Sequence, residues 1–142
     1  TNAKMSEYHA AIGLAALDMW DDIKADYRRV ARRYADNLGD NDGVRLLPGY
    51  GEGRVSAFNM IAADGLDKKK LVENGIEIRD WWRQGCHREP LFKSAARTDM
   101  SVTDFLVKTS VGLPCYRDLP DSDIDYVSEV LRKQIKKEFR WD

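Results

Sequence analysis

The chain has 142 residues and a formal net charge of −1; 43% of its residues are hydrophobic and 33% are charged. Such a length and composition predict one domain with a hydrophobic core. The near-zero charge gives no electrostatic basis for binding nucleic acid or an anionic membrane surface, and no apolar run approaches the roughly 20 residues of a membrane span.

Residues 6–37 are predicted to form one long helix. Ser6 is placed to cap its N-terminus, and Gly39 to end it in a left-handed conformation. Residues 10–17 are apolar nearly all round, which predicts burial on several sides, whereas 21–33 predict one solvated face. The apolar positions recur at gaps of three and four, the period of a helix face: Tyr8, Ile12, Ala16, Trp20, Ile23, Tyr27, Val30, Tyr34 and Leu38.

This helix would be roughly 48 Å long at about 1.5 Å per residue, so it is expected to bend or to run along a whole flank. It either joins two bodies or belongs to the core of a single domain. It begins almost at the first residue, with no strand or glycine-rich loop before it. That is unusual for a complete α/β enzyme, so we expect a part of a longer polypeptide.

The middle of the chain predicts a small sheet. A short strand at 44–47 leads into the glycines of 49–53, which predict a flexible hairpin, since a phosphate-binding loop needs a helix after it. Residues 55–63 are apolar on both faces and predict an interior strand. A short helix at 66–74 and a strand at 76–81 follow. In that last strand the side chains expected to face inward are Ile76 and Ile78, and those facing outward are Glu77 and Arg79.

Residues 82–90 predict an irregular loop crowded with aromatic, cationic and imidazole groups: Trp82, Arg83, Gln84, Gly85, Cys86, His87 and Arg88. Loops of this kind carry function more often than packing. The alternative is that Trp81 and Trp82 anchor the core and that His87 is a surface residue.

The C-terminal part predicts two helices and a strand. Ser101 and Asp104 resemble a capping box that opens a helix at 102–108, and a strand is expected at 109–113. A last helix starts at Pro120 with the apolar stripe Ile124, Val127, Leu131, Ile135 and Phe139. The cations at its end suit the helix dipole better than a nucleic-acid patch: Lys133, Lys136, Lys137 and Arg140.

These elements together predict an α/β (α+β) layer fold. Three or four short strands would form a mixed or antiparallel sheet, with the first and last helices packed on one face.

The residue types limit the chemistry. His9 and His87 lie far apart, and no Cys, His or carboxylate pair has ligand spacing, so no metal site is expected. Adjacent side chains usually point apart, which disfavours a nucleophile built from Cys86 and His87. A Ser–His–Asp triad stays open, although the GxSxG motif is absent. Cys86 and Cys115 form no CxxC pair, and no signal peptide is visible, which together favour a reducing, cytoplasmic setting.

The binding groups that remain lie at the N-terminus and in the loop: Asn2, Lys4, Arg79, Trp81, Trp82, Arg83, His87 and Arg88. Amide, guanidinium and imidazole donors with flat aromatic walls suit a phosphorylated, ring-bearing ligand. These residues alone indicate no particular reaction.

Three stretches carry further motifs. Residues 1–14 hold Asn-Ala-Lys-Met-Ser-Glu before an Ala-Ala-Ile-Gly-Leu run; 75–90 hold Gly-Ile-Glu-Ile-Arg, then Gly-Cys-His and a proline; 113–127 hold Leu-Pro-Cys-Tyr, then Leu-Pro and an apolar run. In this order they resemble the Asn-x-Arg-Met-Ser-Glu, GIE-T-R…H-x-x-P and LP-x-Y motifs of the DegT/StrS-type sugar-nucleotide aminotransferases. That family has the aspartate aminotransferase fold (fold type I) and uses pyridoxal 5′-phosphate.

The resemblance implies that the chain is the C-terminal, small domain of such an enzyme, with 1–39 as an interdomain helix and 44–142 as a small α/β domain. The family's catalytic lysine lies upstream, on a large domain, so this chain is expected to lack it. Asn2 matches the asparagine that reaches the cofactor phosphate of the neighbouring subunit. Lys4 replaces an arginine that holds anionic substrate groups, which keeps the charge but loses the bidentate fork. His87 matches a histidine that lines the nucleotide-sugar site.

The substrate-binding residues expected from the resemblance are therefore Lys4, Arg79, Trp81, Trp82 and His87. The implied reaction is transfer of an amino group from glutamate to a keto-deoxysugar nucleotide by a homodimer. It would serve surface polysaccharide (lipopolysaccharide, O-antigen) or secondary-metabolite sugar biosynthesis. The chain alone is expected to be inactive. The main alternative is a non-catalytic binding or oligomerisation domain; a helix-turn-helix regulator is disfavoured by the charge.

Overall fold

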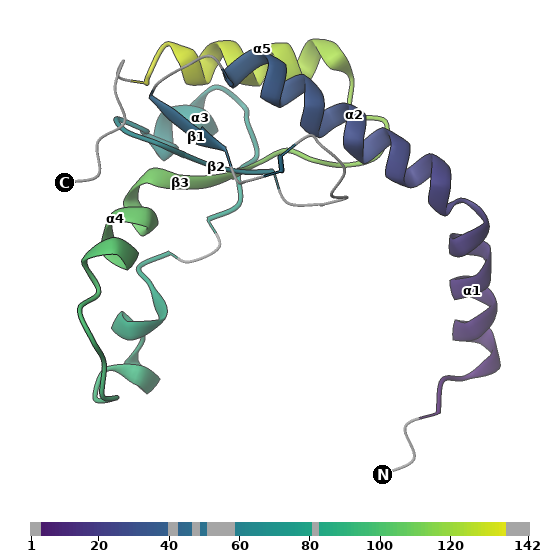
Figure 1. Cartoon of the computed structure of the whole chain (residues 1–142), viewed down its shortest axis with the longest axis horizontal. Helices are drawn as coiled ribbons and strands as arrows, with labels where there is room; N and C mark the ends of the chain where they lie inside the picture. Colours follow the sequence, from purple (N-terminus) through teal and green to yellow (C-terminus); the bar gives the residue numbers. More distant parts are fainter. Residues whose placement is uncertain (1–3, 40–42, 47–48, 51–58, 81–82, 136–142) are drawn as a thin grey trace.

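The computed structural model describes residues 4–39, 43–46, 49–50, 59–80 and 83–135. In chain order the elements are α1 Glu7–Asp18, α2 Trp20–Leu38, β1 Val44–Leu46, β2 Asn59–Ala63, α3 Lys68–Glu73, η1 Cys86–Arg88, η2 Pro90–Phe92, α4 Ser101–Thr109, β3 Ser110–Leu113 and α5 Asp121–Arg132. Figure 1 shows α2 and α5 side by side over the sheet, with α1 and the segment from η1 to α4 extending from it as two separate arms.

The three strands form an antiparallel sheet in the order β1-β2-β3. Val44 of β1 lies opposite Ala63, and Met60 of β2 lies opposite Gly112 of β3. The α/β class and the antiparallel sheet are as predicted, and β2 is the interior strand that its two apolar faces indicated. The part of that predicted strand at 55–58 lies outside the described residues.

The strand predicted at 76–81 is wrong for residues 76–80, and residue 81 lies outside the described part of the chain. Of residues 76–80, Arg79 alone pairs with the sheet, exchanging two backbone hydrogen bonds of 2.9 Å with Gly112. Ile76 is buried and Ile78 packs against the core, so the inward side chains were predicted correctly. The segment then leaves the sheet at Asp80, whose carboxylate pairs with Lys68 Nζ at 2.8 Å. Side-chain packing and this ion pair therefore hold the segment in place, whereas a continuous ladder of backbone hydrogen bonds was expected.

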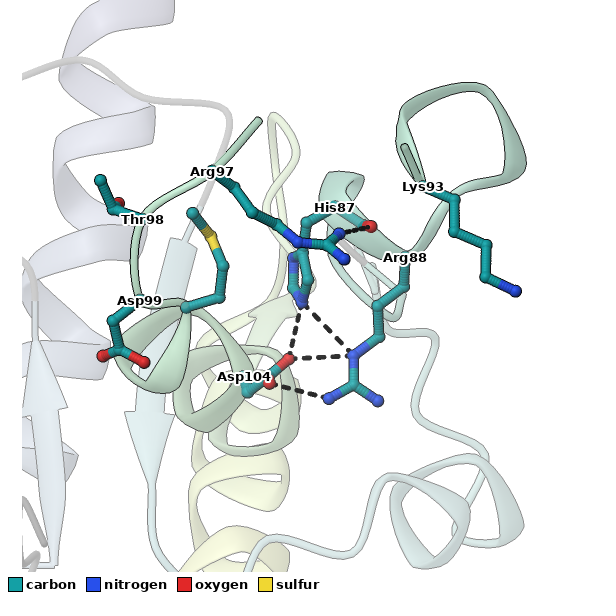
Figure 2. Close-up of a pocket in the computed structure, with 8 residues that line it drawn as sticks. His87, Arg88, Lys93, Arg97, Thr98, Asp99 and Asp104 are labelled. Atoms are coloured by element: carbon teal, nitrogen blue, oxygen red, sulfur yellow. Dashed lines mark hydrogen bonds and ion pairs between the residues drawn. The ribbon is translucent and has the colours of Figure 1, made fainter. Parts of the chain in front are cut away.

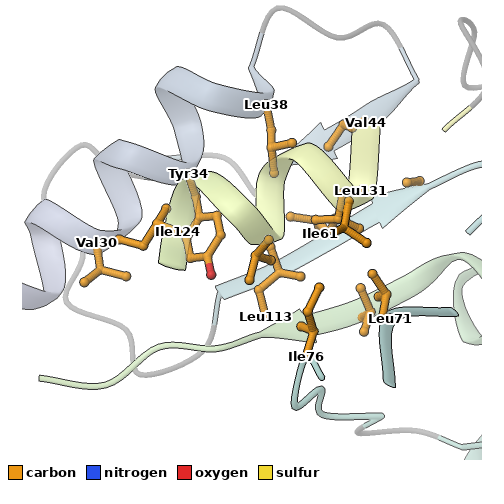
Figure 3. Close-up of a cluster of buried hydrophobic side chains, with 14 of the residues drawn as sticks. Val30, Tyr34, Leu38, Val44, Ile61, Leu71, Ile76, Leu113, Ile124 and Leu131 are labelled. Atoms are coloured by element: carbon orange, nitrogen blue, oxygen red, sulfur yellow. The ribbon is translucent and has the colours of Figure 1, made fainter. Parts of the chain in front are cut away.

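One hydrophobic core lies between the sheet and the α2–α5 pair (Figure 3). On α2, Val30, Tyr34 and Leu38 follow the predicted stripe and are fully buried. On α5, Ile124 and Leu131 do the same. The other labelled members of the cluster are Val44, Ile61, Leu71, Ile76 and Leu113. The stripes of these two helices therefore predicted their packing correctly.

A seam of polar contacts ties α2 to α5 beside this core. Arg33 donates to both carboxylate oxygens of Asp125, at 2.8 and 2.7 Å, and Asn37 Nδ2 donates to the same carboxylate at 2.8 Å. The hydrogen bonds from Arg33 and then Asn37 lower the pKa of Asp125 to about 2. Arg29 pairs with Asp121 in the first turn of α5.

The predicted single helix is two helices. Met19, with φ −96° and ψ 3°, separates α1 from α2, so the chain bends there, as the excess length indicated. Ser6 caps α1 as predicted, since its side chain accepts a hydrogen bond from the His9 N–H. Gly39 was predicted wrongly: its φ is −65°, so α2 ends in the right-handed region. The expected burial of residues 10–17 is also wrong for this chain, because α1 has no buried residue.

The last helix begins where Pro120 and Asp121 predicted and ends at Arg132. Ile135 lies beyond that end and is partly buried against the core. Phe139, Lys136, Lys137 and Arg140 lie outside the described residues. Within the described parts of the chain, no helix combines the length and apolar character that crossing a membrane requires.

Candidate functional site

A hollow of about 490 Å³ lies between the η1–η2 segment and the first turn of α4. The residues lining it are His87, Arg88, Lys93, Arg97, Thr98, Asp99, Met100 and Asp104. Figure 2 shows the Arg97 guanidinium group near the upper end of the His87 ring, and the Arg88 guanidinium group and the Asp104 carboxylate below the ring. The hollow therefore gathers three cationic side chains and two carboxylates, those of Asp99 and Asp104.

His87 reaches this position because Gly85 turns the chain immediately before it. Gly85 has φ +87°, and a Cβ there would lie 2.7 Å from His87 Cε1 and 2.9 Å from His87 Nδ1. Only glycine meets both demands. The Arg88 N–H then donates to the Gly85 carbonyl at 3.1 Å and closes the η1 turn. The His87 side chain is 13% exposed, so its ring is a wall of the hollow and not a freely solvated group.

Asp104 holds this turn against α4. Its Oδ1 lies 3.0 Å from His87 Nε2 and accepts from Arg88 Nε at 3.1 Å, while its Oδ2 accepts from Arg88 Nη2 at 2.7 Å. The hydrogen bond from Arg88 is the largest cause that lowers the pKa of Asp104, and His87 adds to it. Asp104 is therefore ionised and shared between two side chains of η1.

The predicted capping box is consequently wrong. Met100 occupies the N-cap of α4 and makes no side-chain hydrogen bond, while the Ser101 hydroxyl donates to Asp99. Asp104 sits three residues after Ser101 as a capping box requires, but its carboxylate turns away from the helix end towards the two residues of η1. A cationic neighbour that forms a bidentate pair outcompetes a single bond to a backbone N–H.

Arg97 is fixed from the other side, because its Nη1 donates to the His87 carbonyl oxygen at 2.7 Å. Lys93 is exposed on the wall formed by η2, and Figure 2 shows its side chain extending away from the Asp104 cluster. With His87 neutral, three cations and two carboxylates line the hollow, a net charge of +1. Guanidinium groups suit oxyanions, above all phosphate and carboxylate.

The structure brings together only part of the predicted site. Lys4 is exposed just before α1, and His87 lies in η1; Figure 1 shows α1 and the segment from η1 to α4 as separate arms. Arg79 is exposed, pairs with Glu77 at 2.9 Å and is not among the residues that line the hollow. Arg88 joins His87 in the hollow. The predicted residues Asn2, Trp81 and Trp82 lie outside the described part of the chain.

Lys93, Arg97 and Asp104 were not among the predicted site residues. Lys93 and Arg97 stand in a segment without helical or strand periodicity, where isolated cations are ordinary surface residues. Asp104 is 17 residues from His87, and its spacing from Ser101 indicated a cap. The one signal in the sequence was that basic residues recur at short intervals from the end of the loop onward, at Arg88, Lys93 and Arg97.

The fold and the hollow define a small α/β domain with a hollow lined mainly by charged side chains. Comparison of the sequence makes the class specific: residues 1–132 match the model of the DegT/DnrJ/EryC1/StrS aminotransferase family. The chain belongs to this family.

Curated and solved relatives agree with that assignment. EpsN of Bacillus subtilis (strain 168), named as a pyridoxal phosphate-dependent aminotransferase, is 31% identical over 140 residues, which are 92% of this chain and 36% of EpsN. A structure from Bacillus cereus, described as that of a PLP-dependent aminotransferase, superposes with a TM-score of 0.81 at 28% identity and covers 93% of this chain and 38% of its own. DesI, solved with its TDP-sugar product, has a TM-score of 0.75 at 26% identity, and the match covers 94% of this chain and 36% of DesI. The chain thus spans little more than a third of these relatives.

Proposed function

We propose that the chain is the small domain of a pyridoxal phosphate-dependent aminotransferase, in which residues 1–39 join it to a larger domain and 44–142 form the small α/β body. The family match and the shared third of each relative support this proposal. The exposed apolar side chains of α1 support it too, because a helix of that composition is expected to be covered in the working protein. The catalytic lysine would come from the larger domain.

The proposed reaction transfers an amino group from glutamate to a keto-deoxysugar nucleotide in a homodimer. It would serve the synthesis of surface polysaccharide or of a secondary-metabolite sugar. DesI, which was solved with a TDP-sugar product, supports this substrate class. The donor set of the hollow supports it as well, since guanidinium groups and a net positive charge suit the phosphates of a nucleotide sugar. A cytoplasmic setting accords with Cys86 and Cys115, neither of which forms a disulfide in the described part of the chain.

The lining of the hollow fits an anionic group better than the whole cofactor. A pyridoxal ring needs apolar or aromatic walls, and the residues around the hollow are mainly charged, with Met100 as the apolar exception. We therefore place no cofactor step on these residues. When bound to the enzyme, pyridoxal phosphate supplies the electron sink for amino transfer. In this proposal Asn2 contacts its phosphate, and the substrate wall comprises Lys4, Arg79, Trp81, Trp82 and His87.

The observation that carries the proposal is the half-buried His87 in a cation-lined hollow of a chain in this family. In the intact polypeptide, replacing His87 with alanine is expected to raise the KM for the nucleotide sugar roughly tenfold, because the hollow loses the ring that Asp104 holds as part of its wall. The matched control is His9→Ala, which removes an exposed imidazole on α1. An unchanged KM and kcat in His87→Ala would return His87 to an ordinary surface role.

The division of labour between domains has its own test. The 142-residue chain and the intact polypeptide are each incubated with pyridoxal phosphate, glutamate and a keto-sugar nucleotide. Cofactor absorbance and amino transfer are expected from the intact polypeptide alone. Turnover by the 142-residue chain would overturn the proposal that its catalytic lysine lies elsewhere.

A second candidate function is a non-catalytic oligomerisation domain, and the exposed face of α1 is the observation in its favour. Analytical ultracentrifugation of the chain distinguishes the two. Self-association through α1 that Leu14→Lys abolishes favours the oligomerisation domain, whereas a monomer favours a helix that packs on the rest of a longer enzyme.

A further inference from the structure

The imidazole of His87 has little free hydrogen-bonding capacity. Its Nε2 lies 3.0 Å from Asp104 Oδ1. Its Nδ1–Cε1 edge faces Gly85 so closely that a Cβ there would lie under 3 Å from both atoms. A ligand that approached through the hollow would therefore meet a ring whose Nε2 lies next to Asp104 and Arg88 and whose Nδ1–Cε1 edge lies near the Gly85 backbone. His87, Arg88 and Asp104 are called the frame below, because hydrogen bonds hold the three side chains together.

Arg97 is the group that this frame presents. Its Nη1 is anchored on the His87 carbonyl at 2.7 Å, and its remaining N–H groups have no acceptor among the residues that the structure describes. An arginine has five N–H donors in a rigid fork, so one anchored donor leaves a preorganised edge for a planar or tetrahedral oxyanion. Figure 2 shows this guanidinium group near the upper end of the His87 ring, joined to the His87 carbonyl oxygen.

The carboxylate of Asp104 does not oppose an incoming anion as strongly as its charge suggests. Both of its oxygens accept hydrogen bonds from Arg88, and Oδ1 also faces His87. Its negative charge is thus balanced within the frame by the Arg88 guanidinium. Arg97 and Lys93 remain as the cations that are not paired to Asp104.

We propose that this hollow is a subsite for one phosphate group, in which Arg97 makes the contact, the exposed Lys93 adds only a solvent-screened charge at the edge of the hollow, and Asp104 is the positioning residue. Asp104 orients His87 and Arg88, and His87 in turn anchors Arg97 through its carbonyl oxygen. The proposal rests on the proposed function in one respect, because a nucleotide-sugar substrate carries phosphate groups. It goes beyond that function in giving the contact to Arg97 and in giving His87 an indirect part.

The contact is tested by titrating inorganic phosphate into the 142-residue chain at pH 7 and following the Arg97 Nε–H resonance by NMR. Arg97→Ala is expected to weaken binding roughly tenfold or more, and Arg97→Lys by nearly as much because the fork is lost. Lys93→Ala is expected to cost about twofold, since it removes only a screened charge. Lys69→Ala, which removes an exposed charge on α3, is the matched control. Binding equal to that of the unmodified chain in Arg97→Ala, or no phosphate binding at all, would overturn the subsite.

The positioning role of Asp104 is tested with the variant Asp104→Asn. For this variant, simple charge attraction and a positioning role predict opposite changes in phosphate affinity. The substitution raises the net charge of the hollow by one, so simple charge attraction predicts tighter phosphate binding. A positioning role predicts binding weaker by roughly fivefold to tenfold, because the frame that anchors Arg97 loosens. Asp104→Glu, which keeps the acceptor, is expected to restore part of the loss. Tighter binding in Asp104→Asn would overturn the positioning role.

The His87 ring supplies a spectroscopic readout of the same point. In the neutral ring, a hydrogen bond from Nε2–H to Asp104 selects one tautomer, which the ¹⁵N shifts of the imidazole report. Asp104→Asn is expected to give a mixture of tautomers at His87, while His9, the other histidine of the chain, stays unchanged. A single unchanged tautomer at His87 would contradict the frame. The phosphate and tautomer experiments need neither cofactor nor turnover, so they can fail while the proposed function holds, and the reverse.

Discussion

Helices α1 and α2 follow one another in the chain, yet their burial is the opposite of what their compositions suggest. The sequence of α1 is mostly apolar, but none of its residues is buried, and Tyr8 is 74% and Leu14 64% exposed. Nearly half of the residues of α2 are charged, and yet it buries Val30 and Tyr34 completely. Burial therefore depends on what lies opposite a helix: α5 and the sheet lie opposite α2, whereas α1 extends beyond the core (Figure 1).

The charges of α2 are part of the same contrast. Its arginines lie beside the buried stripe and meet the carboxylates of α5, through the pairs Arg29–Asp121 and Arg33–Asp125. Polar groups at the edge of an interface fix its register, while the apolar stripe supplies most of the stabilisation. On α1, by comparison, Ser6 and His9 make only local contacts at the first turn.

The difference in burial between α1 and α2 is tested most strongly by replacing one leucine in each helix with alanine. Leu38→Ala in α2 is expected to lower the free energy of unfolding by about 2–5 kcal/mol, because Leu38 is fully buried and the change leaves a cavity. Leu14→Ala in α1 is expected to change it by no more than about 0.5 kcal/mol. Urea unfolding followed by circular dichroism measures both. Equal losses would mean that α1 belongs to the same cooperative core.

A second variant asks whether α1 is covered elsewhere. Leu14→Lys is expected to leave the unfolding of the 142-residue chain unchanged, since the new charge is solvated. In the intact polypeptide of the proposed function it is expected to cost about 1–3 kcal/mol, because the charge would then be desolvated against the larger domain. Thermal unfolding of both proteins gives the comparison. The same small effect in both would leave α1 uncovered in the enzyme.

The α2–α5 seam predicts a dependence on pH. The pKa of Asp125 falls from 3.8 to about 2 in the folded chain, so its ionised form is favoured by folding. That stabilisation is fully present above about pH 4 and is lost as the pH falls through about 2. The urea midpoint of the unmodified chain is therefore expected to drop more between pH 6 and pH 3 than that of Asp125→Asn. Parallel drops would show that the contacts with Arg33 and Asn37 do not bias this carboxylate.

The smallest effect is expected at the start of α1. Ser6→Ala removes the side-chain acceptor of the His9 N–H, so the first turn should open more readily by about 1 kcal/mol. Hydrogen exchange at the His9 amide is expected to accelerate roughly fivefold, with the global unfolding midpoint unchanged. A shift of the global midpoint would indicate that α1 is coupled to the core after all.

The candidate site shows the same division between local and distant information. The crowding of polar and aromatic residues in 82–90 directed attention to His87 and Arg88, and both line the hollow. Asp104 was assigned to a cap, since its spacing from Ser101 suits one and its partners lie 16 and 17 residues away. Lys4 and Arg79 were grouped with His87 as possible binding groups and through a family resemblance, and neither is among the residues that line the hollow.

The sequence by itself determined the helical stripes of α2 and α5, the interior strand β2, the cap at Ser6 and the family. Each of these depends on residues close together in the chain, or on motifs read in order. The tertiary structure alone decided that the long helix breaks at Met19, that α1 stays exposed and that Asp104 turns towards His87. The physical reason is that side-chain periodicity describes which face of an element is apolar, whereas burial and ion pairing depend on which distant segment the folded chain brings against that face.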